Sequence, residues 1–546
     1  MKAFKFILKS FTLMAAVFFT FQSSALCAEF ELAGRPFFIN GFITQESALG
    51  VDNSQFSGRL LSAYTTLQLE WEFKLSQSVS LYGINRLFGD QAYNINHNRH
   101  WFQRANRQNA QPTNARENME WEWNTNDRGW EVFREIYFDI YTENWQFRLG
   151  KQQVIWGESD GLRLMDCINP QDLRYEFNLR DSDEGYEYTR IPLWLIKATY
   201  FPKIEPFGVR DLQVEFVINP GKPKHDRLEL YGSEGGVWAT EMPNLPTDIR
   251  VNVTNKDHKT SLDNSEFAVR VMGDYDGWLF TLNAYYGYQQ ENTSILVPTG
   301  PTPVSPAWDG AGLTLNFDKK FYHKKLVGFT LNKELTAIRL RKTTSPVLRV
   351  EALYEFDKPF CYEGDNIGGM AWTGLGPYSQ ARKFKDQIRM MVGFDWQIYI
   401  RALNKRESFF TSAQFFVFYI RGKNGEYVNA PFYFNNKIKQ GTMGDAQTSG
   451  DFGSYIDPWR IHQTQKYFSF LMNTYYDNKR IMPQVLYLCD LNEKAHGVKA
   501  KLAFNYGSHW RPEVGVMMWW GDHDTGKSFG LFQKNRQVYM KIKYQF

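Results

Sequence analysis

Apolar and polar residues alternate along most of this chain in segments of about ten residues, and no other feature constrains the fold as strongly. In the segment LQLEWEFKL (67–75), apolar side chains occupy every second position, with charged or amide side chains between them. The segment RMMVGFDWQIYIR (389–401) likewise separates an apolar face from a polar face. A period of two predicts β-strands, and this length is typical of a strand that crosses a membrane at a tilt.

Two further observations distinguish a membrane barrel from other β folds. Aromatic residues make up 17% of the 546 residues although the mean hydropathy is only -0.48, and no run of about 18 apolar residues follows the N-terminus. A soluble β-sandwich also alternates, but its strands are usually about five or six residues long. We therefore predict an all-β transmembrane antiparallel β-barrel of about 16 strands, within about 14 to 18, which satisfies every backbone group in lipid.

The N-terminus predicts export. Lys2, Lys5 and Lys9 precede an apolar run, and the sequence SSALCAEF then offers small residues to a signal peptidase. We expect residues 1–28 to be a cleaved signal peptide, with cleavage after Cys27 as the alternative, and residues 29–546 to be one barrel domain. Without the three lysines the mature chain is almost neutral, so its charge gives no support for nucleic-acid binding.

The cysteines of the mature chain, Cys167, Cys361 and Cys489, are far apart in the sequence. They allow at most one disulfide, and the sequence does not decide whether any two pair. No CxxC or CxxCH motif indicates zinc or covalent haem, and we expect no cofactor.

The last strand, VYMKIKYQF, ends the chain with aromatic residues on its apolar face. Tyr544 and the terminal Phe546 resemble the signal that the barrel assembly machinery of the outer membrane reads. We therefore expect the protein to be inserted into the lipid of the Gram-negative outer membrane by that machinery.

Long segments rich in glycine, proline, asparagine and acids separate the strands and predict large loops on one side of the barrel. The candidate external loops are Asn94–Arg128, Glu158–Arg190, Pro220–Asn264, Thr293–Trp308, Phe360–Lys385 and Gly422–Arg460.

One of these loops carries a recognisable pattern. The stretch GKQQVIWGESDGLRLMDCINPQDL, followed by RIPLWLIKATY, resembles the hallmark of a family of Gram-negative outer-membrane proteins catalogued as a domain of unknown function, number thirteen-zero-two. The resemblance implies a setting beside an exporter of the resistance-nodulation-division type and a lipid-sorting-like partner, with hydrophobic substrates such as steroids or aromatics. It implies no catalytic residue.

Charges of both signs in this loop predict its position. Its acids and arginines can pair with one another, and its acids can pair with a basic lumen wall if the loop folds inward and narrows the channel. A solvated surface loop is the alternative. An inward loop would turn rigidly at Asn169-Pro170. We expect the constriction loop to use Glu158, Asp160, Arg163, Asp166, Asp172 and Arg174, and the lumen wall to present Arg148, Arg349, Arg389 and Arg401.

The expected pairing is between loop acids and lumen arginines such as Arg148 or Arg389. Because bases outnumber acids on the polar strand faces, the wall would then favour anions. The function predicted is an outer-membrane channel or transporter for small or hydrophobic molecules, and not an enzyme.

Two other roles stay open from the sequence. Some outer-membrane barrels are hydrolases, and Asp522, His523 and Asp524 could contribute to such a site, although a short polar turn explains them equally well. Ser159 in GESDG lacks the glycine pattern of a nucleophile elbow, and His97 with His100 is weak as a metal site. A structural or adhesive barrel is the other alternative.

Overall fold

The computed structural model describes most of the chain. The described residues are 28–51, 57–92, 95, 122–123, 132–172, 187, 189–226, 249–255, 260–290, 295–298, 313–338, 344–363, 382–424, 426–428, 461–521 and 528–546. Within these residues, no helix is long and apolar enough to cross a membrane.

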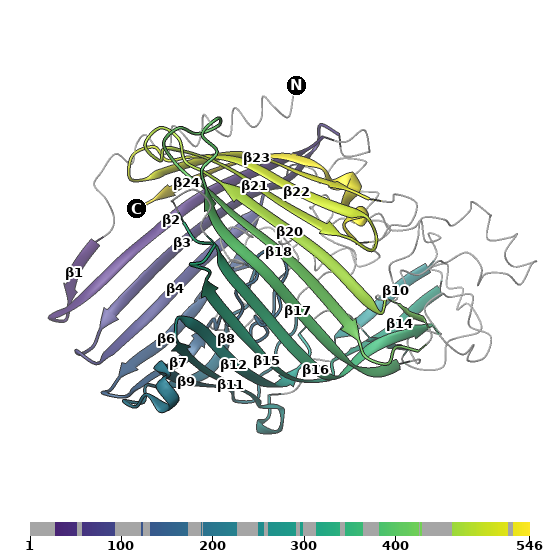
Figure 1. Cartoon of the computed structure of the whole chain (residues 1–546), viewed down its shortest axis with the longest axis horizontal. Coiled ribbons are helices and arrows are strands. Elements are labelled where there is room, and N and C mark those ends of the chain that lie inside the picture. Colours follow the sequence, from purple (N-terminus) through teal and green to yellow (C-terminus); the bar gives the residue numbers. More distant parts are fainter. Residues whose placement is uncertain are drawn as a thin grey trace, which may run out of the picture.

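The described part of the chain forms a closed antiparallel barrel of 18 strands, at the upper end of the predicted range (Figure 1). The last strand closes it by pairing with β2, from Phe42 opposite Gln545 to Gly50 opposite Gln537. The barrel strands are β2 (Arg35–Gly50), β3 (Leu60–Lys74), β4 (Val79–Asp90), β6 (Glu135–Tyr141), β7 (Trp145–Gln152), β8 (Leu193–Tyr200), β9 (Arg210–Asn219), β11 (Glu266–Tyr275), β12 (Trp278–Tyr288), β15 (His323–Glu334), β16 (Val347–Glu363), β17 (Arg382–Ile398), β18 (Phe409–Ile420), β20 (Thr464–Asn473), β21 (Ile481–Asp490), β22 (Ala495–Phe504), β23 (Trp510–Trp520) and β24 (Gln537–Gln545).

Several short elements accompany the barrel. A small sheet outside it contains a parallel pair, β10 with β14, which the sequence did not predict. The remaining elements are β1 (Ala28–Leu32), β5 (Glu122–Trp123), β10 (Ile249–Asn255), β13 (Ile295–Pro298), β14 (Leu313–Lys320), β19 (Glu426–Val428) and the 3₁₀ helices η2 (Pro206–Gly208), η3 (Leu262–Asn264) and η6 (Ser528–Asn535).

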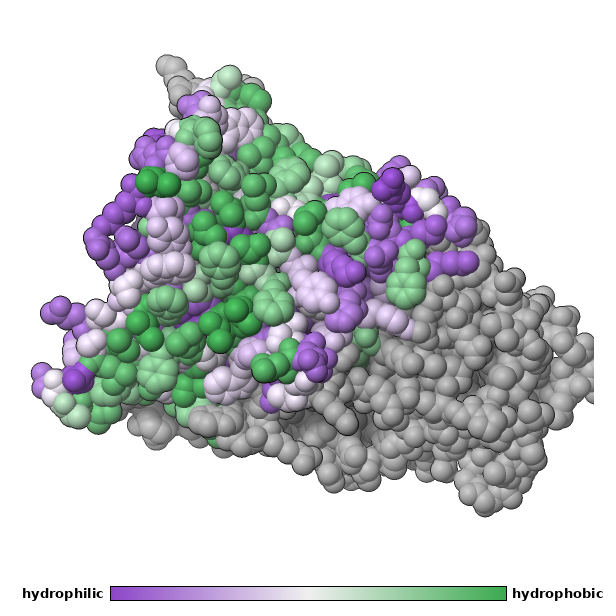
Figure 2. All heavy atoms as spheres, turned by 90° about the horizontal axis from the view of Figure 1, so that it is seen from below, coloured by the Kyte–Doolittle hydropathy of each residue, from purple (hydrophilic) through white to green (hydrophobic). Residues whose placement is uncertain are grey.

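Alternation places the side chains as the sequence predicts. Met390 on β17 and Phe415 on β18 point outward and are 40% and 41% exposed, whereas the adjacent Met391 and Phe416 point inward and are fully buried. Figure 2 shows apolar side chains spread over the outer face of the described strands. An apolar outer face is what a strand in contact with lipid requires.

The two ends of the barrel differ in the length of their connections. At one end the turns are short: Asp276 and Gly277 join β11 to β12, and both have positive φ (50° and 72°) as a two-residue hairpin turn requires. At the other end lie the long connections, including residues 153–192 between β7 and β8. In bacterial barrels the short turns face the periplasm and the long loops face outward.

The C-terminal residue takes part in closing the barrel. Phe546 donates its backbone N–H to the carbonyl of Gly41 at 2.9 Å and accepts from the N–H of Gly41 at 3.0 Å. Tyr544 lies opposite Ile43 of β2 and Trp510 of β23. Whether these two residues are also an assembly signal stays a prediction.

Candidate constriction site

Residues 153–172, here called the inward loop, leave β7 and cross the lumen to strands on the opposite wall. The backbone N–H of Asp160 donates to Gln414 Oε1 on β18 at 2.8 Å, and Ser469 Oγ on β20 donates to the Asp160 carbonyl at 3.3 Å. The backbone N–H of Glu158 donates to Glu351 Oε2 on β16 at 3.0 Å. The loop therefore lies inside the barrel and narrows it.

Apolar side chains anchor the loop inside the lumen. Leu164, Met165 and Ile168 are at most 3% exposed and join one cluster with side chains from the wall. The wall contributes Leu195, Val217, Ala268, Tyr285, Leu326, Leu353, Met391 and Phe416, which come from successive strands β8 to β18. Since burying one such side chain stabilises by about 1.5–3 kcal/mol, this cluster makes a large apolar contribution to holding the loop.

Doubled apolar residues in the sequence mark this cluster. In Met390-Met391 and Phe415-Phe416, one residue faces outward and the other faces the loop. A second apolar residue, at a position that alternation reserves for the polar lumen, is therefore the sequence signal of this cluster.

The tip of the loop pairs with one arginine of the wall. Arg349 Nη1 lies 3.1 Å from Asp160 Oδ2 and 2.9 Å from Asp395 Oδ2, and its Nε lies 4.0 Å from Glu158 Oε2. Burial raises the pKa of Asp160 above its ordinary value, although Arg349 opposes this shift. Three carboxylates thus surround a single guanidinium.

A second ion cluster lies within the loop. Asp166 Oδ2 accepts from Arg163 Nε at 3.0 Å, and Arg190 Nη2 approaches the same oxygen to 2.7 Å. Burial opposes the charge on Asp166, but the two arginines outweigh it and lower the pKa of this carboxyl below its ordinary value. This cluster joins the first part of the loop to Arg190, just before β8 begins.

Asn169 ties together the two ends of the connection. Its Oδ1 accepts from the Val154 N–H at 2.7 Å, and its Nδ2 donates to the Ile191 carbonyl at 2.9 Å and to the Gln152 carbonyl at 3.3 Å. Asn169 is fully buried, so these bonds are shielded from water. The predicted Asn169-Pro170 turn therefore lies at the neck of the loop, where its side-chain hydrogen bonds hold the neck together.

Trp156 fixes the start of the loop against the wall. Its Nε1–H donates to Glu215 Oε1 on β9 at 2.7 Å, and Arg270 and Lys197 lie 3.2 and 3.4 Å from the same carboxylate. The Trp156 side chain is 2% exposed and lies in the lumen cluster, not at the membrane interface where tryptophans of such barrels are common.

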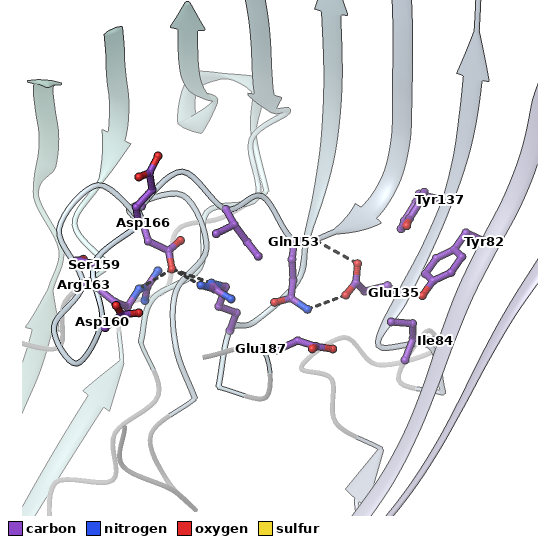
Figure 3. Close-up of a pocket in the computed structure, with 14 residues that line it drawn as sticks. Tyr82, Ile84, Glu135, Tyr137, Gln153, Ser159, Asp160, Arg163, Asp166 and Glu187 are labelled. Atoms are coloured by element: carbon purple, nitrogen blue, oxygen red, sulfur yellow. Dashed lines mark hydrogen bonds and ion pairs between the residues drawn. The ribbon is translucent and has the colours of Figure 1, made fainter. Parts of the chain in front are cut away.

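A cavity of about 470 Å³ lies between the loop and the wall strands β4 and β6. Figure 3 shows Tyr82, Ile84, Glu135 and Tyr137 on the wall side, and the loop residues facing them. The loop side of the lining consists of Gln153, Ile155, Gly157, Glu158, Ser159, Asp160, Arg163 and Asp166, with Glu187 and Arg190 from the return segment.

Among the described residues, the acids at the loop tip pair with Arg349, one of the predicted wall arginines, and not with Arg148 or Arg389. Arg148 makes two 2.8 Å hydrogen bonds to Asp139 on the neighbouring strand β6, and Arg389 lies 2.9 Å from Glu355 on the neighbouring strand β16. Pairing between adjacent strands places each of these arginines beside an acid of the wall. Arg148 and Arg389 are therefore each neutralised by an acid of the wall, and whether the lumen favours anions stays a prediction.

Arg401 is also placed differently from the expectation. It lies in the turn after β17, where its guanidinium is 4.1 Å from the Tyr399 ring and donates to the Lys405 carbonyl. The strand ends at Ile398, three residues before the sequence pattern suggested, so Arg401 is an exposed turn residue and not part of the lumen wall.

The other candidate residues are only partly described. Asp172 donates its backbone N–H to the Thr189 carbonyl at 2.6 Å, so it lies at the neck and not at the tip. Cys167 and Cys489 are free buried thiols, so no two of the three mature cysteines are paired, and burial raises the pKa of Cys167 to about 11. Arg174, His97, His100, Asp522, His523 and Asp524 lie outside the described residues.

Sequence reasoning missed three residues that hold the loop. It gave Glu351, Gln414 and Arg190 no role in holding the loop, yet all three bind the loop directly. Their position on polar strand faces or beside a strand gave no indication of which loop they would meet.

Fold and site together define a class: a transmembrane-type β-barrel whose lumen is narrowed by one of its own loops. The sequence pattern of the family described as "Protein of unknown function (DUF1302)" matches residues 47–546, so the chain belongs to that family. A search of curated proteins gives no match.

Three solved structures align with most of this chain at low sequence identity. Pseudomonas aeruginosa OpdK with vanillate aligns at 8% identity and a TM-score of 0.43, covering 93% of this chain and 98% of that one. Acinetobacter baumannii OccAB2 aligns at 10% identity and 0.42, covering 94% and 98%. Salmonella typhi OmpF in complex with daunomycin aligns at 9% identity and 0.39, covering 95% and 100%.

Proposed function

We propose that this protein is an outer-membrane channel in which the inward loop sets the width and the selectivity of the lumen. The observation that carries the proposal is the contact between the loop tip and the far wall, where Asp160 meets Arg349 and Gln414. A loop held across a lumen by hydrogen bonds and ion pairs limits the size of what can pass. This role requires no catalytic residue, and we assign none.

The transported molecules are small or hydrophobic in this proposal. The family resemblance supports an exporter of the resistance-nodulation-division type and a lipid-sorting-like protein as partners, with insertion by the barrel assembly machinery. Such molecules need an apolar and a polar surface, and the lumen offers both. Ile155 of the loop is 51% exposed beside the carboxylates of Glu158 and Asp160.

Removing the loop tests the channel proposal. Residues 159–185 are replaced by a short glycine-serine linker, and the matched control removes residues 430–456, a segment of equal length from another candidate external loop. Single-channel conductance in planar bilayers and uptake of a large antibiotic in a porin-deficient strain should both rise for the first deletion alone. Heat-modifiable migration on gels confirms that each barrel is assembled.

An unchanged channel after this deletion would refute the proposal. If the assembled 159–185 deletion has the conductance and antibiotic uptake of the intact protein, the inward loop does not limit passage and the proposal fails.

A further inference from the structure

The cavity beside the inward loop has an apolar and aromatic wall. The rings of Tyr82 and Tyr137 are stacked with centroids 5.0 Å apart, and Ile84 and Ile155 lie in the same lining. Arg148 covers the Tyr137 ring at 4.2 Å while its charge is bound by Asp139. This wall suits the flat or aliphatic body of a small organic molecule, and about 470 Å³ is a typical volume for such a site.

The loop side of the cavity carries an excess of negative charge. Arg163 and Arg190 line it, but both bind Asp166. The carboxylates of Glu158 and Asp160 are 33% and 35% exposed and share Arg349 with Asp395, so this base cannot neutralise all of them.

Two buried oxygen atoms of the lining accept no hydrogen bond within the described part of the chain. Asp166 is 7% exposed, and its Oδ1 has no hydrogen-bond partner among the described residues. Oε1 of Gln153, whose Nε2 donates to Glu135 at 2.7 Å, also has none there. An unsatisfied buried acceptor is costly, and a ligand that donates hydrogen bonds would remove that cost.

We propose that this cavity binds organic cations that carry an aromatic or aliphatic body and N–H donors, such as protonated primary and secondary amines. The carboxylates attract the charge, the face of Tyr82 contributes a cation–π contact, and Ile84 and Ile155 receive the body. The inference deepens the proposed function by naming a class of molecule for the narrowed part of the channel.

Calorimetric titration of the purified full-length protein in detergent tests the site without any measurement of current. The probe is benzylammonium, the form of benzylamine at neutral pH, and benzenesulfonate is the anion of similar size. We expect the cation to bind and the anion not to bind. The double variant Glu158→Gln with Asp160→Asn should weaken cation binding about tenfold or more, and Tyr82→Leu should weaken it several-fold.

Two further variants distinguish the loss of negative charge in the lining from a displacement of the loop. Glu187→Gln removes a charge from the lining without touching the contacts of Glu158 and Asp160 to the wall, and it should also weaken binding. Glu143→Gln with Asp477→Asn removes two exposed charges from short turns at the far end of the barrel and should leave binding unchanged.

Tighter binding of benzenesulfonate than of the cation overturns the inference, as does undiminished cation binding by both the double variant and Glu187→Gln. Because binding is measured without current, these results do not depend on whether the 159–185 deletion changes conductance. The inference and the channel proposal can therefore fail separately.

Discussion

The carboxylate of Glu351 should act as the main polar latch of the inward loop. It is 1% exposed on β16 and accepts two backbone N–H groups from the loop, those of Glu158 at 3.0 Å and of Met165. Glu351→Ala removes both acceptors while leaving the barrel hydrogen bonds of β16 in place. The perturbation therefore acts on the position of the loop.

The free-energy cost of the substitution follows from the two backbone N–H groups that lose their acceptor. Each buried N–H left without a partner costs about 1–3 kcal/mol, so two cost about 2–6 kcal/mol if the loop stays in place. The variant also relieves the desolvation of a buried carboxylate, which places the net cost at the lower end, about 2 kcal/mol. A shift of this size raises the population of the displaced loop roughly 30-fold, while the apolar cluster around Met165 still favours the inward position.

Single-channel recording measures this population as brief openings to a higher conductance. We expect them to be frequent in Glu351→Ala and intermediate in Glu351→Gln, which keeps one acceptor oxygen. Glu355→Gln is the matched control, because Glu355 is equally buried on the same strand but pairs with Arg389 and Lys358. Opening frequencies in Glu351→Ala no higher than in the control would refute the latch.

Two other predictions concern assembly and pH. Deleting Phe546 removes both backbone hydrogen bonds to Gly41, and the yield of heat-modifiable protein in the outer membrane should fall; an unchanged yield would contradict the role of the terminal strand. Burial raises the pKa of Asp160 above 3.8, whereas Arg163 and Arg190 lower that of Asp166 below 3.8 against the effect of burial. The Asp166 contribution to loop stability is thus present above pH 3.8 and lost only as the pH falls through its lower folded value. Acidification should therefore protonate Asp160 and weaken the binding of organic cations before it releases the loop. Cation binding and single-channel conductance measured from pH 7 to 3 would show the opposite order if this is wrong.

The sequence alone determined the strands and the orientation of their faces. Alternation is a local property, since each strand shows its inner and outer side chains within about ten residues. The outward Met390 and the inward Arg389 could therefore be assigned without knowing any neighbour in space. The family was also recognisable, because its hallmark is a continuous stretch of sequence.

The extent of the strands was less well determined. The pattern in residues 389–401 continues past Ile398, where the structure begins a turn, and Arg401 was assigned to the wall for that reason. Alternation does not distinguish the last residues of a strand from the first residues of an extended turn. The number of strands was accordingly predicted only as a range.

Only the tertiary structure decided what the inward loop touches. Glu158 binds a carboxylate 193 residues away, and Asp160 binds an amide 254 residues away. Sequence reasoning chose Arg148 and Arg389 because they lie on polar faces, but each already had an acid on the adjacent strand. Which wall residues face a loop depends on how the whole barrel closes and on how far the loop descends, and both are set by contacts between strands that are distant in the chain.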